Sequence, residues 1–216
     1  MIRSRFENQL HRLNNDMILM GALCEDIISK SIELLSGDSS SAENALSIYQ
    51  KIEQLERDIE AQCLKLLLLQ QPVASDLRHI SAALKMVYDL KRIGAQAAEV
   101  AEIVGAGRIQ SEKELAGLHV MVDHVLGMVT TGIDAFVQED VTLANQVIKK
   151  DDKVDQEFDT MKKRLIAYFS GEDVDGEQAI DVLMVAKYIE RIGDHTVNIA
   201  KWVIFSITGQ LDGDVT

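Results

Sequence analysis

Residues Arg92-Ile93-Gly94 recur as Arg191-Ile192-Gly193, 99 residues later, and this repeat decides how the chain is organised. The same offset relates residues on both sides of the tripeptide: Lys51 and Lys150, Glu56 and Asp155, Glu60 and Asp159, Leu84 and Leu183, and Ala101 and Ala200. A constant offset without a gap indicates two similar structural units.

Apolar periodicity around the repeat predicts six long helices, because one proline and 13 glycines leave few turns. Their expected bounds are about 3–35, 41–69, 76–104, 111–137, 142–169 and 176–207, with serine caps before the second and third helices. Helices this long are typical of antiparallel bundles joined by short loops. We therefore predict an all-α fold of two pseudo-symmetric three-helix bundles, residues 1–107 and 108–216.

The charge and apolar content exclude several classes of protein. Asp+Glu number 35 against 22 Lys+Arg, a net charge of −13, which argues against nucleic-acid binding. Cys24 and Cys63 lack a C-x-x-C spacing and are expected to be reduced thiols. No secretory signal is evident, and no apolar run approaches the ~18 residues of a membrane span. We expect a cytoplasmic protein that does not span the membrane.

Three acids share one face of the fifth predicted helix. Asp151, Asp155 and Asp159 follow i, i+4, i+8 spacing, so Asp151 and Asp159 lie about 40° to either side of Asp155. They interrupt an apolar stripe formed by Ile148, Ile166 and Phe169. Like charges at this spacing repel, so a bound cation or a set of basic partners is expected to compensate them.

The sixth predicted helix supplies a second pair of acids, Glu190 and Asp194, beside its apolar face. Two facing helices would then present four or five oxygen ligands to a divalent or iron-type ion: iron, manganese, magnesium or zinc. The alternative is a solvated stripe whose acids pair with Lys149, Lys150, Lys153, Lys162 and Lys187. His195 points about 100° away from Asp194 and is expected at a surface or interface.

The first unit departs from this pattern. Glu56 and Glu60 keep the acidic pair, but Lys91 and Ala95 stand where Glu190 and Asp194 stand in the second unit, and Ile52 replaces Asp151. We expect Lys91 to neutralise the pair as an interhelical salt bridge, so that a metal site here is weak or lost. Asp89 remains as a possible ligand.

The chain resembles the PhoU family of phosphate-uptake regulators. The resemblance rests on residues 71–78 (QPVASDLR), the repeated Arg-Ile-Gly, and residues 151–159 and 189–194, and it extends over essentially the whole chain. It implies two three-helix bundles and a non-enzymatic role that restrains phosphate transport and the phosphate-starvation response. The partners that it implies are the ATPase subunit of the phosphate ABC transporter and, in many bacteria, a sensor histidine kinase.

Members of this family carry E/D-x-x-x-D motifs that in some cases hold iron or other divalent metals. The second unit matches at Asp151, Asp155, Asp159, Glu190 and Asp194. The first unit departs at Lys91 and Ala95, so the resemblance carries a metal site only to the second.

Two further segments allow alternatives. Asp76 and Arg78 suit either a partner contact or a helix cap and first turn. Trp202 makes the last helix apolar on nearly all sides, which fits either a homodimer contact or a thick internal core.

The competing function is a ferritin-like, carboxylate-bridged metalloenzyme. Such enzymes use Glu-x-x-His motifs, and the nearest match here is Asp76-x-x-His79. The sequence also lacks a nucleophile–base pair and a phosphate-cradling glycine loop, so an adaptor without turnover is favoured. A plain coiled coil is disfavoured because the apolar stripe is interrupted.

Overall fold

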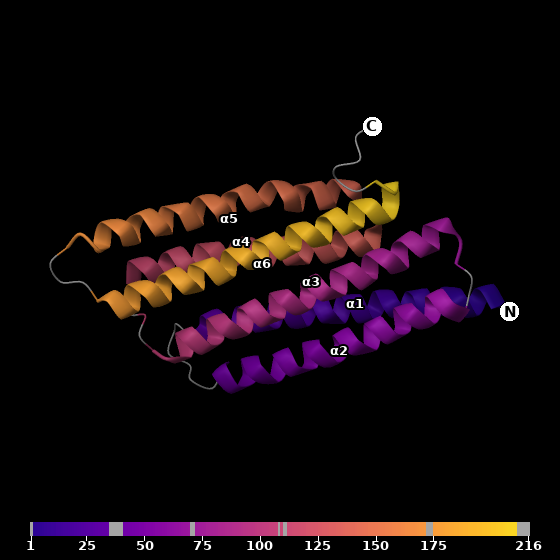
Figure 1. The fold of residues 1–216 in the computed structure, drawn as a ribbon, viewed down its shortest axis with the longest axis horizontal. Coiled ribbons are helices and arrows are strands. Elements are labelled where there is room, and N and C mark those ends of the chain that lie inside the picture. The colour runs from indigo at the N-terminus through magenta and orange to yellow at the C-terminus, as the bar shows by residue number, and fades with distance from the viewer. Residues whose placement is uncertain are drawn as a thin grey trace.

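The computed structural model describes residues 2–34, 41–69, 72–107, 109, 112–171 and 175–210. The described residues form six long helices and no strand, which confirms the all-α prediction (Figure 1). They are α1 (Ile2–Glu33), α2 (Ser41–Leu69), α3 (Ala74–Gly105), α4 (Glu112–Gln138), α5 (Val141–Tyr168) and α6 (Gly176–Thr208). The predicted bounds agree with these to within about two residues.

The start of α3 differs from the prediction. Its N-cap is Val73, which has an extended backbone and no side-chain capping hydrogen bond, so the helix begins before Ser75. The first turn closes through Leu77 N–H donating to the Val73 carbonyl at 2.9 Å. Asp76 therefore lies within the first turn, where a carboxylate favours the helix dipole. The serine cap predicted for α2 lies outside the described residues.

Helices α5 and α6 have side-chain caps. The Asp140 carboxylate accepts from Thr142 N–H at 2.6 Å and from Leu143 N–H at 3.2 Å, and Asp175 accepts from Gln178 N–H at 3.1 Å. These bonds satisfy helix-end donors that otherwise lack a partner. The Asp140 cap sets the start of α5, the helix that carries Asp151, Asp155 and Asp159.

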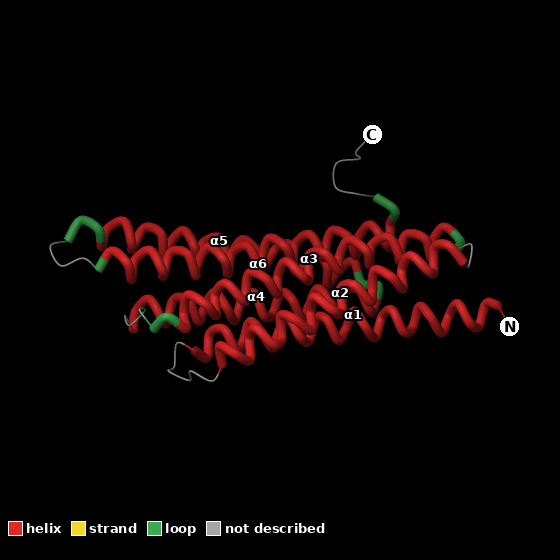
Figure 2. The backbone as a smooth tube through the Cα atoms, turned by 60° about the horizontal axis from the view of Figure 1, so that its bottom comes forward, coloured by secondary structure: helices red, strands yellow, loops and turns green. Residues whose placement is uncertain are grey.

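The six helices form two triplets that share one core. Helices α1, α2 and α3 pack against one another, as do α4, α5 and α6, and the triplets meet along α3 with α6 and α1 with α4 (Figures 1 and 2). The buried apolar side chains form one continuous cluster. Gly21 permits the close approach of α1 to α4, because a Cβ there would lie 2.7 Å from Ile133 Cγ1.

Helices α3 and α6 run antiparallel at the centre of the molecule. The start of α3 meets the end of α6, where Arg78 Nε donates to the Ser206 carbonyl at 3.4 Å. Trp202 packs partly buried against the core, edge-on to Phe205. The extra apolar face of α6 thus serves an internal core, and the homodimer stays a prediction.

One helix is long and apolar enough to cross a membrane by length and composition alone, contrary to the expectation of none. It covers Glu114–Gln138 of α4, and half of its most apolar window is buried inside the bundle. Because α4 packs against α1, α5 and α6, this composition is that of a bundle's core helix.

We expect Asp140→Ala to lower the free energy of unfolding by about 1 kcal/mol, because two α5 amides lose their acceptor. Urea unfolding followed by circular dichroism measures the change. Val73→Ala is the matched control, since this N-cap makes no side-chain bond. Equal losses in the two variants would contradict the assignment of the cap.

Candidate functional site

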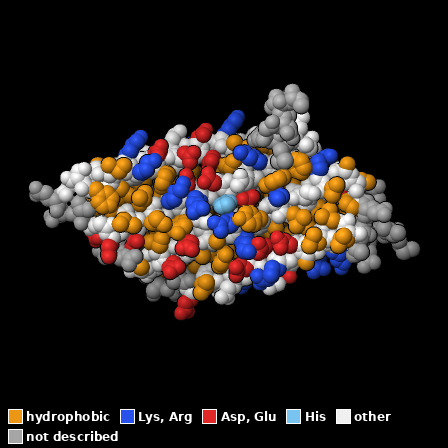
Figure 3. Space-filling model, in the orientation of Figure 1, with side chains coloured by type: hydrophobic (Ala, Val, Ile, Leu, Met, Phe, Trp, Pro, Cys, Tyr) orange, Lys and Arg blue, Asp and Glu red, His pale blue; other side chains and the backbone are white. Residues whose placement is uncertain are grey.

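The predicted acids gather along the outer seam between α5 and α6. Figure 3 shows Asp and Glu side chains concentrated over the middle of these two helices. Burial raises the pKa of Asp151 to about 6, with further contributions from Asp155, Asp194 and Glu190. Burial and then the charge of Glu190 likewise raise the pKa of Asp155. Asp159 also contributes to the rise at Asp155, so each of the five predicted ligands lies close enough to at least one other to repel it.

Gly193 makes room for Asp151, which is half-buried. A Cβ at Gly193 would lie 2.8 Å from Asp151 Oδ1, so the carboxylate rests against the backbone of α6. The repeat places Gly94 in the same role, where a Cβ would lie 2.8 Å from Cδ1 of Ile52. At equivalent helix contacts, the glycine therefore faces the Ile52 methyl group in the first unit and the Asp151 carboxylate in the second.

Lysines neutralise part of the seam. Lys187 Nζ lies 2.5 Å from Glu190 Oε2 and 5.2 Å from the centre of the Phe158 ring. Lys162 pairs with the exposed Asp159 at 2.6 Å and thereby lowers the pKa of that carboxyl. Two of the five lysines proposed in the solvated-stripe alternative therefore do pair with seam acids, whereas Asp151 and Asp155 keep raised pKa values.

The seam lies beside the buried face of α5. Its core residues are Ala144, Val147, Val154, Met161 and Leu165. The apolar stripe expected to surround the acids is largely on the outside, since Ile166 is 62% exposed and Phe169 49% exposed. The acids therefore border the core and solvent, and Asp155 and Asp194 are exposed.

The side chains do not converge on a single point. Within the described ranges, no three His, Cys, Asp or Glu side chains are grouped so that they could hold a metal ion as they stand. The raised pKa values show electrostatic coupling, which acts over longer distances than coordination.

The corresponding seam of the first unit contains the predicted salt bridge. Lys91 Nζ lies 2.7 Å from Glu56 Oε2, and Glu56 is buried. The hydrogen bond from this lysine to Glu56 raises the Lys91 pKa. This part of the prediction is confirmed for Glu56, whereas Glu60 is exposed.

The structure places Asp89 away from that pair. Its buried carboxylate is 2.9 Å from His195 Nδ1 and accepts from Asn198 Nδ2 at 3.3 Å, so it faces α6. Asp89 precedes Lys91 by two positions, which turns it about 160° around α3 and away from α2. Asp89 thus joins the two units, and His195 is an interface residue as one alternative held.

Asp76 and Arg78 line a cavity of about 390 Å³ where the two units meet. The cavity also contains a contact that the sequence analysis missed. His79 lies 2.9 Å from Asn14 Oδ1, stacks on Phe136 and is 3.8 Å from Glu139, and burial lowers its pKa. Glu139 is the described non-glycine residue with positive φ, at 52°. Residues with a side chain seldom adopt this backbone conformation, so the α4–α5 turn is locally strained.

Comparison with known proteins settles the family. The sequence matches the PhoU domain over residues 17–104 and again over 118–203, one match in each helix triplet. The chain belongs to the PhoU family.

Relatives agree with this assignment over nearly the whole chain. A phosphate-specific transport system accessory protein PhoU homolog of Pseudomonas aeruginosa is 34% identical over 96% of this chain and 87% of its own. The phosphate-specific transport system accessory protein PhoU of Escherichia coli K12 is 27% identical over 97% and 88%.

Solved PhoU structures have the same fold. The crystal structure of PhoU from Pseudomonas aeruginosa gives a TM-score of 0.90 at 32% identity, covering 95% of this chain and 100% of that one. The phosphate transport system regulatory protein PhoU from Streptococcus pneumoniae gives 0.87 at 26% identity, covering 95% and 98%. The predicted PhoU resemblance and helical fold are confirmed.

We expect Asp151→Asn to stabilise this PhoU family member at pH 7.5 after treatment with a chelator. The pKa of Asp151, about 6, exceeds its ordinary 3.8, so the folded state holds the proton more tightly than the unfolded state. The wild type therefore gains stability as pH falls through 6 toward 3.8, and the variant lacks this gain. Allowing for solvent screening, we expect a difference of about 1 kcal/mol at pH 7.5 that vanishes near pH 4.

Urea unfolding at several pH values measures this difference. Asp134→Asn is the control, because it removes the same charge from an exposed position on α4. A variant that is less stable than wild type at pH 7.5 would contradict the coupling of the seam acids.

Proposed function

We propose that this chain is a non-enzymatic accessory protein of phosphate uptake that negatively regulates transport and the phosphate-starvation response. The observation that carries the proposal is the double PhoU domain match, one in each triplet, together with relatives named phosphate-specific transport system accessory proteins. The proposed partners are the ATPase subunit of the phosphate ABC transporter and the phosphate-responsive sensor histidine kinase. We propose a cytoplasmic location, where both contacts would be made.

The surface supports docking rather than catalysis. The net charge of −13 and the acids over α5 and α6 favour a partner with a basic face. Exposed apolar side chains adjoin these acids toward the α5–α6 turn: Ile166, Phe169, Ile180 and Met184. A face that combines charge with apolar contacts has the composition of a protein interface.

We propose further that the α5–α6 seam binds a divalent or iron-type cation. Asp151, Asp155, Glu190 and Asp194 would hold it, with Asp159 at the edge of the site. The raised pKa values of Asp151 and Asp155 and the space that Gly193 leaves for a carboxylate support this assignment. Exposed Asp155 and Asp194 are free to rotate toward the seam. A bound cation would offset the repulsion among these acids and offer a point of contact to phosphate.

The first unit is proposed to lack this site. Its buried Glu56 is already neutralised by Lys91, so a cation would have to displace an ion pair. The two units would therefore differ in metal content despite their common fold.

The metalloenzyme alternative gains no support from His79. Its ring lies against Phe136 and hydrogen-bonds with Asn14, at the end of the bundle. Ferritin-like centres are built from Glu-x-x-His motifs, and the sequence contains none.

Deletion of the gene should derepress phosphate-starvation genes in cells grown in excess phosphate, because the restraint on signalling is lost. Transcript levels measure the effect, and wild-type protein supplied from a plasmid should restore repression. Recovery of the transporter ATPase with the tagged protein from cross-linked cells tests the contact itself. Unchanged transcripts in the deletion strain would refute the regulatory proposal.

Asp155→Ala/Asp194→Ala should abolish metal uptake by purified protein, because it removes one ligand from each helix of the seam. Elemental analysis after dialysis against iron, manganese, magnesium or zinc measures the content. The control, Asp123→Ala/Asp134→Ala, removes two exposed acids from α4 and should keep the wild-type content. Equal metal in the seam variant and the wild type would overturn the site.

A further inference from the structure

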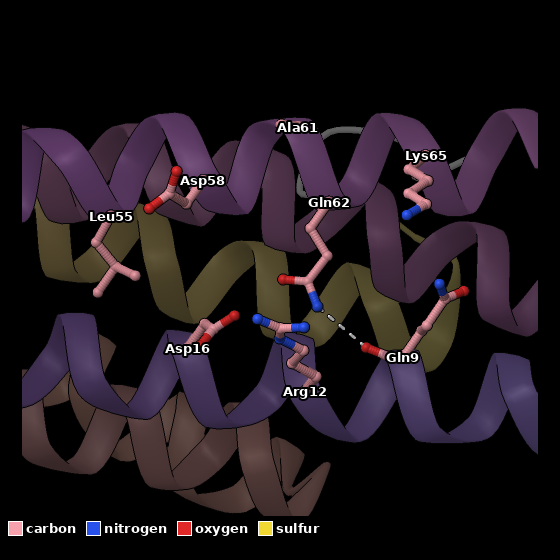
Figure 4. Close-up of a pocket in the computed structure, with 8 residues that line it drawn as sticks. All are labelled: Gln9, Arg12, Asp16, Leu55, Asp58, Ala61, Gln62 and Lys65. Carbon is pink, nitrogen blue, oxygen red and sulfur yellow. Dashed lines mark hydrogen bonds between the residues drawn. The ribbon is translucent and has the colours of Figure 1, made fainter.

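A cavity of about 510 Å³ lies between α1 and α2, on a side of the first unit that neither proposal above uses. Figure 4 shows side chains from both helices pointing into it. The ones that carry the argument are Gln9, Arg12, Asp16, Asp58, Gln62 and Lys65.

The cavity has an acidic end and a basic end. Asp16 and Asp58 face each other across it near Leu55, Arg12 lies next along the cavity with its guanidinium beside Asp16, and Lys65 lies toward the other end (Figure 4). Among the described residues, none of these four charged side chains forms an ion pair within 4.0 Å, although Asp58 accepts a hydrogen bond from Gln54 on its own helix. Two carboxylates and two cations thus line one cavity without a direct ion pair, although the charge of Arg12 acts on Asp16.

The surrounding groups add unmet hydrogen-bonding capacity. Gln62 Nε2 donates to the Gln9 main-chain carbonyl at 3.3 Å, but the buried side-chain oxygen of Gln9 has no donor. Burial raises the pKa of Asp16, and Asp58 raises it further while Arg12 opposes the rise. An ammonium group placed between the two carboxylates would relieve this repulsion.

The second unit shows that the fold does not need the cavity. The 99-residue offset places Met161 at the position of Gln62. Met161 is 1% exposed and packs against α4, where a Cβ on Gly117 would lie 2.6 Å from its terminal methyl group. A buried methionine packs against α4 at the position where, in the first unit, a polar glutamine lines the cavity.

We propose that the α1–α2 cavity binds a small dipolar molecule with an ammonium group at one end and a carboxylate at the other. The ammonium group sits between Asp16 and Asp58, and the carboxylate binds Arg12 and Lys65. An ion of single sign would leave one pair of charges uncompensated and would meet repulsion from the other pair. The site is distinct from the α5–α6 seam, so its test does not depend on the regulatory or metal proposals.

Isothermal titration with matched amphoteric and single-charge probes tests the inference. The probes are β-alanine and γ-aminobutyrate, with butyrate and butylamine as analogues that retain one charge. Saturable binding of at least one amino acid, at least about fivefold tighter than either analogue, is expected because two charged contacts form in place of one. No saturable binding of either amino acid, or equal binding of an analogue, would overturn the proposal.

Three variants locate the site. Gln62→Met introduces the second unit's own residue and should remove binding while thermal unfolding by circular dichroism shows the fold retained. Lys65→Gln should weaken binding about fivefold, whereas Lys51→Gln, the same change at an exposed position of α2 outside the cavity, should leave it unchanged. Undiminished binding by a folded Gln62→Met variant would place the ligand elsewhere and refute the assignment.

Discussion

The close contact of paired helices at Gly94 and Gly193 is the constraint on which the rest of the structure depends. Each glycine lets a side chain of the preceding helix touch the backbone, and a Cβ at either position would come within 2.8 Å of it. In the first unit that side chain is Ile52, and in the second it is Asp151. The backbone repeat is preserved while an apolar contact is exchanged for a charge. A carboxylate held against a helix has fewer solvating waters, which is why the Asp151 pKa rises further than that of exposed Asp155.

The same asymmetry governs how the units join. Helices α3 and α6 are equivalent in the repeat, so each contact between them has a counterpart elsewhere along the same interface. Buried Asp89 on α3 meets His195 on α6, whereas the equivalent positions hold Tyr188 on α6 and Gln96 on α3. Gln96 is buried, and its side-chain oxygen has no hydrogen-bond partner among the described residues. A buried polar contact made once fixes the register of two nearly equivalent helices, because a slip would leave Asp89 without its donors.

Apolar spacing along single helices was sufficient to predict the six helices, and the 99-residue offset identified the repeat. Acid spacing on the fifth and sixth helices, which the repeat pairs, located the seam. The Lys91–Glu56 bridge was also predictable, since the offset identified which positions face each other. Asp89 was not, because helical geometry alone does not state which neighbour a residue faces. The Asn14–His79 contact joins residues 65 positions apart, and no periodic signal reports such a pair. The N-cap of α3 was predicted too late in the chain, because Ser75 and Asp76 are residues that favour N-cap positions. The observed N-cap, Val73, makes no side-chain hydrogen bond, so residue type did not indicate it.

Helix α6 connects the candidate metal site with the joint between the units. Asp194 belongs to the charged seam facing α5, while the next residue, His195, contacts Asp89 of α3. Successive residues diverge by about 100° around a helix, so Asp194 and His195 face different neighbours from the same turn of α6. The charged seam and the polar contact between the two units therefore meet at adjacent residues of α6. The first unit offers no equivalent connection, because Lys91 already neutralises its buried acid and Ala95 occupies the position of Asp194. Helix α6 thus carries acids of the charged seam and also the histidine that meets Asp89, so it belongs to both contacts.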